Sequence, residues 1–525
     1  MYRPSLPETD EPVEPAFADP DSCARWITQF QLTDIRLAHR TLTRKLSGLN
    51  RAVLSPLVRL KVTEQLRETV DIVQESYGRK LVGKPLPLSD SESSIRDEIV
   101  SLWAEMATSY GHCLNAGIDG EPSVAGHLAR ICQRCLHYTA LQISGYIFLS
   151  HQVDSRLWLQ LHQLYRLSED AGFSTVPESF DRHLPPTSCA DHFIRTVLLC
   201  QADPYELTRS QLQLVNRWLD GWTSLVVITR DIPASAKTSP PIAIDLESSG
   251  CILHPASRGA AIRYLDMSEL GKNLKIKMVL LQQGQAPSQL GLGESLPPDF
   301  CLSLIEKLHR HWCEGKMARR FDERTISHRA ELCFGLEEIH FHLSGKVFTQ
   351  PVEKSSLNKR QHEEIGLFGH IASKGEQKNG RGTESWNIQD ENGKEFSLIR
   401  TEKGVRVSPG HLVGIRGDEG FVLCVIRWAI AGLDGSVNMG LKLLEGRPEA
   451  VAIRQTGINL TVSGKYVPAI LLHFGERTSL VMPKEWYVRN RIIAVLDREG
   501  LSMEFKLTGL AGKGADYERA TFMQI

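Results

Sequence analysis

The sequence lacks long apolar runs and an excess of charge of either sign. Its 525 residues carry 61 Lys and Arg against 62 Asp and Glu, a net charge of −1, which argues against binding of nucleic acid or anionic membrane by the whole surface. The longest apolar stretch, near 140–149, is interrupted by Gln142, Ser144 and Gly145 and is too short to span a bilayer. No secretory signal opens the chain, and the Pro-rich, acidic residues 1–21 are predicted to be a disordered tail. We therefore expect a cytoplasmic protein with no membrane insertion and no nucleic-acid partner.

The sequence motifs of common catalytic sites are missing as well. There is no G-x-x-x-x-G-K-[S/T], no G-x-S-x-G and no H-E-x-x-H. Acidic pairs such as Glu337-Glu338 are typical of solvated charge. The sequence therefore predicts a protein that is not an enzyme and that uses no cofactor.

The cysteines do not form a metal-binding pattern. Only Cys132 and Cys135 are close in sequence, whereas a structural zinc site needs a second Cys or His pair at ligand spacing. The nearby His112, Cys113 and His137 do not have that spacing. The pair also lies inside a helical pattern and not at a helix start, which would lower a thiol pKa. We predict buried, reduced thiols and no metal site, with a redox or zinc role as the alternative.

Residues 22–222 have apolar side chains at helical spacing and are predicted to form an all-helical domain of about seven helices. Ser89, followed three residues later by Glu92, predicts the start of one of them. The pattern is broken at 83–85, 117–122 and 183–186 by Gly and Pro. We find no sequence repeat, so a bundle and a repeat-like array both remain possible.

Residues 223–318 have a mixed pattern that predicts a small α/β connector. A β-branched run at 225–228 comes first, and two further strands are expected at 242–246 and 261–265. Two helices are expected next, at 267–283 and 298–314.

The remainder of the chain is rich in short strands and predicts two antiparallel β-barrels, over 319–450 and 451–525. Residues 329–335 and 338–343 are predicted to form a hairpin, and 351–381 a mobile loop. The other strands of the first barrel are expected at 385–389, 396–401, 411–415, 421–428 and 439–444. Those of the second are expected at 452–454, 459–461, 469–472, 478–481, 491–496 and 502–508, with a hairpin loop at 512–514. The fold class is thus multi-domain α+β.

A cluster of arginines marks the junction between the connector and the first barrel. Arg320 and Arg324 form an R-x-x-x-R pair, with Arg319 before it and Arg329 after it. Guanidinium groups grip phosphates through two parallel hydrogen bonds or stack on aromatic bases, so the cluster suits a planar, multiply charged ligand. The alternative is an exposed basic patch that joins a helix end to the next domain.

This order of motifs resembles PilZ domains, the bacterial receptors for cyclic di-GMP. Their pattern has an R-x-x-x-R before the first strand, a [D/N]-x-S-x-x-G turn, a strand ending near Trp, and a last strand preceded by Gly. Here Arg320 and Arg324 match the first element, and 390–395 occupies the second. Val422–Trp428 and Gly440–Leu444 resemble the closing strands. The resemblance covers about 318–450, and a looser one extends to bacterial multi-domain proteins with a helical N-terminal half.

The resemblance implies cyclic di-GMP as ligand, with Arg319, Arg320 and Arg324 binding its phosphates and bases. It gives Asp390 the role of holding the guanine amino edge and places Asn392 at the usual serine. Glu395 stands where glycine is usual and brings a negative charge near a dianionic ligand.

Two hypotheses follow from this resemblance. In the first, the chain is a non-catalytic cyclic di-GMP receptor or adaptor. Nucleotide at the arginine hinge would control the arrangement of the domains and the binding of a protein partner through the helical domain. In the second, the chain is a constitutive protein-interaction scaffold whose degenerate barrel no longer binds nucleotide. Gly393 leaves the choice open, because it could shift the turn by two residues and restore the fit.

Overall fold

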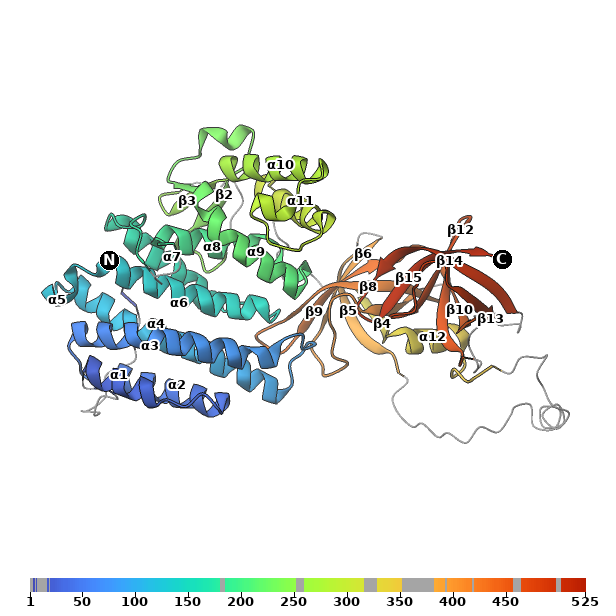
Figure 1. Cartoon of the computed structure of the whole chain (residues 1–525), viewed down its shortest axis with the longest axis horizontal. Helices are drawn as coiled ribbons and strands as arrows, with labels where there is room; N and C mark the ends of the chain where they lie inside the picture. The colour runs from blue at the N-terminus through green and yellow to red at the C-terminus, as the bar shows by residue number, and fades with distance from the viewer. Residues whose placement is uncertain are drawn as a thin grey trace. The chain divides into compact units, whose positions relative to one another are not determined.

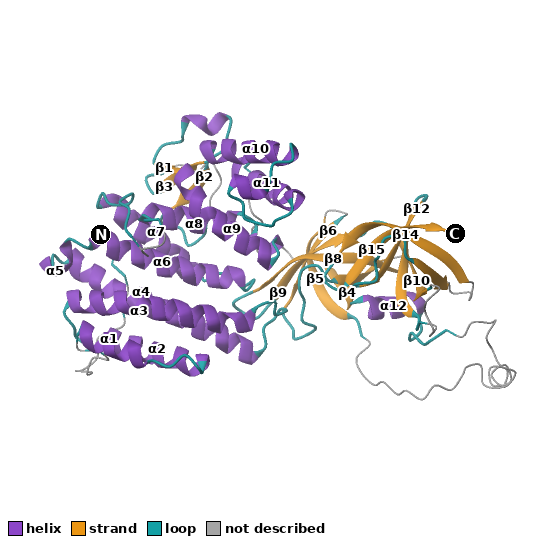
Figure 2. Cartoon of the chain, viewed as in Figure 1, coloured by secondary structure: helices purple, strands orange, loops and turns teal. Residues whose placement is uncertain are grey.

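A computed structural model describes residues 3–4, 6, 17, 19–179, 185–251, 259–315, 328–351, 382–391, 394–417, 420–456, 464–496 and 502–525. Helices dominate the first part of the chain and strands the last (Figure 2). The chain divides into two compact units, Met1–Lys84 with Leu88–Arg320, and Pro85–Pro87 with Phe321–Ile525. The predicted multi-domain α+β class, with a helical N-terminal half and two C-terminal barrels, is confirmed (Figure 1).

Three predictions fall largely outside these described residues. They are the N-terminal tail, the loop at 351–381 and the strand at 459–461. Near the start of the chain, the described Phe17 packs its ring 5.4 Å from that of Trp26. Within the described ranges, no helix has both the length and the apolar composition needed to traverse a bilayer.

The described residues between Pro20 and Trp222 form nine α-helices, two more than expected. The two additional helices arise from breaks at 30–34 and at 126–127, which the apolar pattern did not predict. At the first, the Asp34 side chain accepts hydrogen bonds from the backbone of Arg36 and Leu37 and begins a new helix. The helices are α1 (Pro20–Gln29), α2 (Ile35–Arg51), α3 (Pro56–Gly78), α4 (Asp90–Ile118), α5 (Pro122–Ala125), α6 (Leu128–Phe148), α7 (Ser155–Asp170), α8 (Cys189–Gln201) and α9 (Arg209–Trp222).

The predicted start of α4 is confirmed by its capping box. The Ser89 side chain accepts a hydrogen bond from the Glu92 backbone N–H at 3.4 Å, and the Glu92 carboxylate accepts one from the Ser89 N–H at 2.9 Å. These bonds satisfy two backbone donors that the helix itself leaves unpaired.

The connector shares one hydrophobic core with the helical domain. It contains a three-stranded sheet in the order β1 (Val227–Thr229), β3 (Ile262–Asp266), β2 (Ile242–Asp245), followed by α10 (Ser268–Gln282) and α11 (Pro298–Cys313). Both predicted helices are therefore confirmed. The buried Leu265 and Trp312 belong to the same cluster as residues of α2 to α9.

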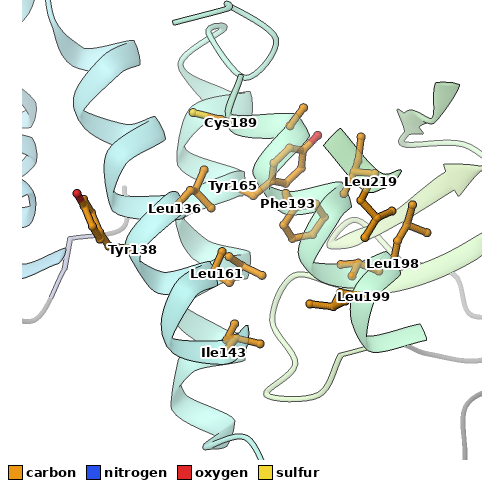
Figure 3. Close-up of a cluster of buried hydrophobic side chains, with 14 of the residues drawn as sticks. Leu136, Tyr138, Ile143, Leu161, Tyr165, Cys189, Phe193, Leu198, Leu199 and Leu219 are labelled. Atoms are coloured by element: carbon orange, nitrogen blue, oxygen red, sulfur yellow. The ribbon is translucent and has the colours of Figure 1, made fainter. Parts of the chain in front are cut away.

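Within that core, α6, α7 and α8 bring their large side chains together (Figure 3). The rings of Tyr165 and Phe193 stack at 4.3 Å and 17°. Cys132 and Cys135 are buried here, as predicted. The Cys189 side chain and burial raise the pKa of Cys132, and burial raises the pKa of Cys135. Both thiols therefore remain protonated, which removes the reactivity that a redox role requires.

The first barrel closes in the order β4-β5-β6-β9-β8-β7. All of its pairs are antiparallel, and side chains that point inward, such as Leu398 opposite Met439, are fully buried. Every strand expected between 385 and 444 is present. The strands are β4 (His328–Phe334), β5 (Glu384–Glu391), β6 (Glu395–Arg400), β7 (Leu412–Gly417), β8 (Gly420–Ala431) and β9 (Val437–Leu443).

The predicted hairpin partner at 338–343 is wrong, because this segment lies in helix α12 (Leu336–Ser344). Leu336, Ile339 and Leu343 are spaced three and four residues apart, which places them on one face of a helix. They pack into a cluster between the two barrels. Two acidic residues in the first turn also favour the helix, since the N-terminal end of a helix attracts negative charge.

The second barrel closes in the order β10-β11-β12-β15-β14-β13, as a separate six-stranded ring. Its tip at 514–516 contacts the first barrel: the Ala515 N–H donates to the Gly410 carbonyl at 2.7 Å, and the Leu412 N–H to the Asp516 carboxylate at 3.0 Å. The last strand was not expected, but it completes the hairpin predicted at 512–514. The strands are β10 (Arg447–Gln455), β11 (Val467–Phe474), β12 (Arg477–Pro483), β13 (Ile492–Leu496), β14 (Ser502–Lys513) and β15 (Tyr517–Gln524).

Candidate functional site

The predicted ligand-binding residues belong to two segments of the sequence, one before β4 and one at the end of β5. Asp390 is described, whereas Arg319, Arg320, Arg324 and Asn392 lie outside the described residues. Strand β4 begins soon after the arginine cluster, and its first residue pairs with β5 two positions before Asp390. His328, the first described residue after the arginine cluster, therefore lies at the end of the barrel where β5 turns into β6.

A β-bulge decides which way Asp390 faces. Ile388 pairs with Leu398, and both side chains are buried in the barrel. The next pair joins Asp390 to Ser397, so Gln389 is an extra residue on β5. Side chains alternate along a strand, so without the bulge Asp390 would point into the barrel with Ile388. The bulge places it on the outer face, where it is exposed.

The outer face beside Asp390 carries polar and charged groups from three strands. Arg329 on β4 pairs with Asn387 on β5, and each is next to a buried residue that points into the barrel. Both side chains therefore lie on the outer face, as do those of Asp390 and Ser397. Arg329 is exposed. This face therefore offers a guanidinium, an amide, a carboxylate and a hydroxyl, which are groups able to bind the edges of a base and a phosphate.

Two further elements of the family pattern meet next to this face. Gly440 pairs with Ser397 on one side and with Trp428 on the other, where a second bulge interrupts β8. A Cβ at Gly440 would lie 2.0 Å from the Trp428 indole nitrogen. Only glycine therefore fits beneath this indole, which explains why a Trp and a Gly occur together in the closing strands.

Glu395, the residue at the usual glycine, lies opposite a lysine. It begins β6 and pairs in register with Lys442 of β9. The next residue of each strand points into the barrel, so the side chains of Glu395 and Lys442 lie on its outer face. The preceding Lys394 ammonium lies 2.5 Å from the Glu445 carboxylate. That carboxylate raises the pKa of Lys394 through a hydrogen bond and charge attraction. The register therefore places Lys442 beside Glu395 on the neighbouring strand, whereas the Lys394 ammonium pairs with Glu445.

A buried ion pair braces β5 and β6 on the other side of the site. The guanidinium of Arg400, which is 3% exposed, pairs with the Glu384 carboxylate and lies 4.6 Å from the Trp386 ring centroid. The same carboxylate accepts hydrogen bonds from the Trp386 indole, at 3.2 Å, and from the Val405 backbone N–H. Sequence reasoning missed this cluster, because its members are far apart in sequence and carry no motif.

Thiols and metal ligands do not contribute to the described part of the site. Burial raises the pKa of Cys333 and of Cys424 to about 12, so both thiols stay protonated at neutral pH. In the ranges that the structure describes, no group of three or more His, Cys, Asp or Glu side chains is placed to hold a metal ion.

Two family models match this chain in succession. Residues 21–234 match the N-terminal domain of the cyclic-di-GMP receptor FimW, and residues 251–403 match its middle PilZ domain. The second match begins in the connector and ends after β6. The cyclic-di-GMP receptor FimW of Pseudomonas aeruginosa is 23% identical over 337 residues, which are 63% of this chain and 54% of that protein. The chain thus spans about half the length of this curated relative.

Two solved structures show a weaker likeness. K. pneumonia MrkH in its apo state is 9% identical, with a TM-score of 0.12 over 27% of this chain and 74% of that one. A structure of MrkH described as a c-di-GMP-dependent transcription regulatory factor is 9% identical, with a TM-score of 0.14 over 40% of this chain and 90% of that one. Likeness at this level carries no argument about the fold.

Proposed function

Since the chain is a PilZ-domain-containing protein, we propose that it is a non-catalytic receptor for cyclic di-GMP. The curated relative is itself a cyclic-di-GMP receptor, and the matches to its N-terminal and middle domains follow the same order along this chain. The absence from the sequence of the common catalytic motifs agrees with a receptor role.

The observation that carries the proposal is the outward turn of Asp390. The bulge at Gln389 places this carboxylate on the same face of the barrel as Arg329, beside the strand end that the arginine cluster precedes. In an unbulged strand the carboxylate would point into the core and could not meet a ligand.

Each part of the ligand has a matching group in the proposed site. Cyclic di-GMP has two phosphates and two guanines. Arg319, Arg320 and Arg324 would bind the phosphates and the O6 and N7 edges, or stack on the bases. Asp390 would accept hydrogen bonds from a guanine amino group, and Asn392 would take the place of the usual serine.

We also propose that the ligand controls the arrangement of the two units and the binding of a protein partner through the helical domain. The chain divides into its units between Arg320 and Phe321, inside the arginine cluster. A ligand held by these arginines would order the segment that connects the units. The ligand would shift the equilibrium toward the arrangement of the two units that binds it more tightly.

Isothermal titration calorimetry of the full chain with cyclic di-GMP tests the receptor proposal. We expect saturable binding, because a multiply charged ligand would meet several guanidinium groups. Absence of both heat and thermal stabilisation with ligand at hundreds of micromolar, on the order of 10⁻⁴ M, would rule the receptor out.

The second candidate is a constitutive interaction scaffold that keeps the barrel for architecture alone. Glu395 favours it, since the register with Lys442 holds this carboxylate on the outer face of the hairpin that a ligand would approach. The scaffold predicts no heat in the same titration. It also predicts that Arg320→Ala and Arg324→Ala leave partner capture unchanged, whereas surface changes on the helical domain abolish it.

We expect Glu395→Gly to tighten the binding of cyclic di-GMP several-fold. The substitution removes a like charge near the phosphates, whose cost at surface-like dielectric is about 1 kcal/mol or more. Lys442, in register with Glu395 on β9, places the expected gain at the lower end of that range. Parallel titrations of the wild type and the variant measure the difference. Glu402→Gly, which removes an exposed carboxylate from the loop after β6, is the matched control.

An affinity that stays the same or falls in Glu395→Gly would contradict the alignment of 390–395 with the family's turn. Glu395 would then be a solvated residue paired with its lysine neighbours. In that case the substitution only destabilises the hairpin slightly, by raising the entropy of the unfolded chain.

A further inference from the structure

A polar cleft lies between the two barrels, and Asp390 is not among the described residues that line it. Its volume is about 440 Å³, and it opens between α12, the start of β8 and the start of β10. This volume falls in the range of roughly 300–1,000 Å³ typical of small-molecule sites. Its lining includes His342, Arg416, Gly420, Phe421, Arg447 and Glu449.

Two nitrogen-containing side chains pack against an aromatic ring on one wall of the cleft. The His342 imidazole lies 4.8 Å from the Phe421 ring at 31°, and the Arg416 guanidinium lies 5.5 Å from the same ring. These contacts fix the positions of both groups without using all of their hydrogen-bonding atoms. The cleft is therefore a preformed arrangement of cationic and polar groups on an apolar support.

Two of the polar groups in the cleft have unused hydrogen-bonding capacity. Nε2 of His342 is enclosed and has no hydrogen-bond partner in the described structure. The exposed Arg447 forms no ion pair or side-chain hydrogen bond with any described residue. A ligand that accepts hydrogen bonds would satisfy the exposed Arg447, whereas the enclosed His342 nitrogen only helps to shape the wall.

The acidic groups near the cleft already have partners. The Glu449 carboxylate lies 2.8 Å from His473 Nε2. Glu331 pairs with Arg416 at 2.7 Å, but both side chains are about half exposed, at 47% and 58%. Such an exposed pair is screened by solvent, so Arg416 can still contribute to an incoming anion.

We propose that this cleft binds a phosphate monoester carried on a compact ring, the class of compound that includes aryl phosphates and mononucleotides. The phosphate would accept hydrogen bonds from Arg447 and from Arg416. The ring would lie against the apolar support that Phe421 and Leu343 form. This proposal does not rest on cyclic di-GMP binding, because no described residue that lines the cleft belongs to the proposed receptor site.

Phosphorus NMR of phenyl phosphate tests this site on the full chain. We expect the ligand signal to broaden with the wild-type protein and the affinity to fall about tenfold in Arg447→Gln, which removes one charge-assisted interaction. Arg489→Gln, an exposed arginine of the second barrel, is the matched control and should bind like the wild type. Benzoate serves as competitor to compare a carboxylate with a phosphate, and should compete poorly.

A second variant separates binding from folding. Arg416→Gln removes the second guanidinium of the cleft, so it should weaken binding while leaving thermal stability nearly unchanged, because its ion pair with Glu331 is exposed. Arg320→Ala should leave phenyl phosphate binding intact even if cyclic di-GMP binding is lost. The proposal is overturned by absence of broadening in the wild type, by equal broadening in Arg447→Gln, or by loss of binding in Arg320→Ala.

Discussion

The double substitution Arg320→Ala with Arg324→Ala is expected to lower the affinity for cyclic di-GMP by roughly a hundredfold or more. A hydrogen bond to a charged group contributes about 1.5–3 kcal/mol, and the two guanidinium groups would each lose at least one. About 3 kcal/mol corresponds to somewhat more than a hundredfold in the dissociation constant. Isothermal titration calorimetry of the wild type and the variant gives both values under one set of salt conditions, which matters because exposed charges are screened.

The Arg489→Ala variant serves as control, since it removes a guanidinium from an exposed position in the second barrel. Its affinity for cyclic di-GMP should match that of the wild type. Small-angle X-ray scattering adds a second readout: ligand should change the radius of gyration of the wild type but not of the double variant. Equal affinities in the wild type and the double variant would place the ligand elsewhere and exclude the arginine hinge.

The second large effect concerns the stability of the first barrel. Glu384→Gln is expected to destabilise it by about 3–5 kcal/mol, the usual cost of removing one partner from a buried ion pair. The reason is that Arg400, only 3% exposed, would keep its charge without a carboxylate beside it. The backbone N–H of Val405 would also lose its charged acceptor. Hydrogen exchange of peptides from β5, β6 and the following loop measures the change locally.

Glu331→Gln is the matched control in the same barrel. Its carboxylate pairs with Arg416, but the two side chains are 47% and 58% exposed. An exposed pair of this kind contributes about 0–1 kcal/mol, so exchange in β4 and β7 should hardly change. Similar protection in Glu384→Gln and the wild type would mean that water replaces the lost carboxylate and that the pair does not brace the hairpin.

The sequence was sufficient to predict most strands and most helices, because alternation and helical spacing are local properties. It did not predict α12, since the run from Leu336 to Leu343 also fits a strand and its preference is decided by burial between two barrels. The helix breaks at 30–34 and 126–127 were not predicted either, and the Asp34 cap after the first of them is not revealed by the apolar pattern.

The candidate site was predictable in its motifs but not in its geometry. The family pattern indicated Asp390 and the pairing of a Trp with a Gly, yet the face on which Asp390 lies depends on one bulged residue, Gln389. Sequence gives no signal for that bulge. The ion pair between Glu384 and Arg400 could not be predicted either, because the two residues lie on different strands and meet only in the folded barrel. The roles of Arg319, Arg320 and Arg324 remain predictions from the sequence.

The contact between the two barrels limits how this protein can be dissected in the laboratory. Leu412 and Leu423 of the first barrel share a buried cluster with Ile470 and Val481 of the second. A chain truncated before β10 would leave this apolar surface in water, at about 25 cal/mol per Å², and would tend to aggregate. A protease cut near Gly446 should instead leave two fragments that stay associated and co-migrate until a denaturant separates them. The PilZ barrel therefore needs residues 447–525 as its companion in any binding assay.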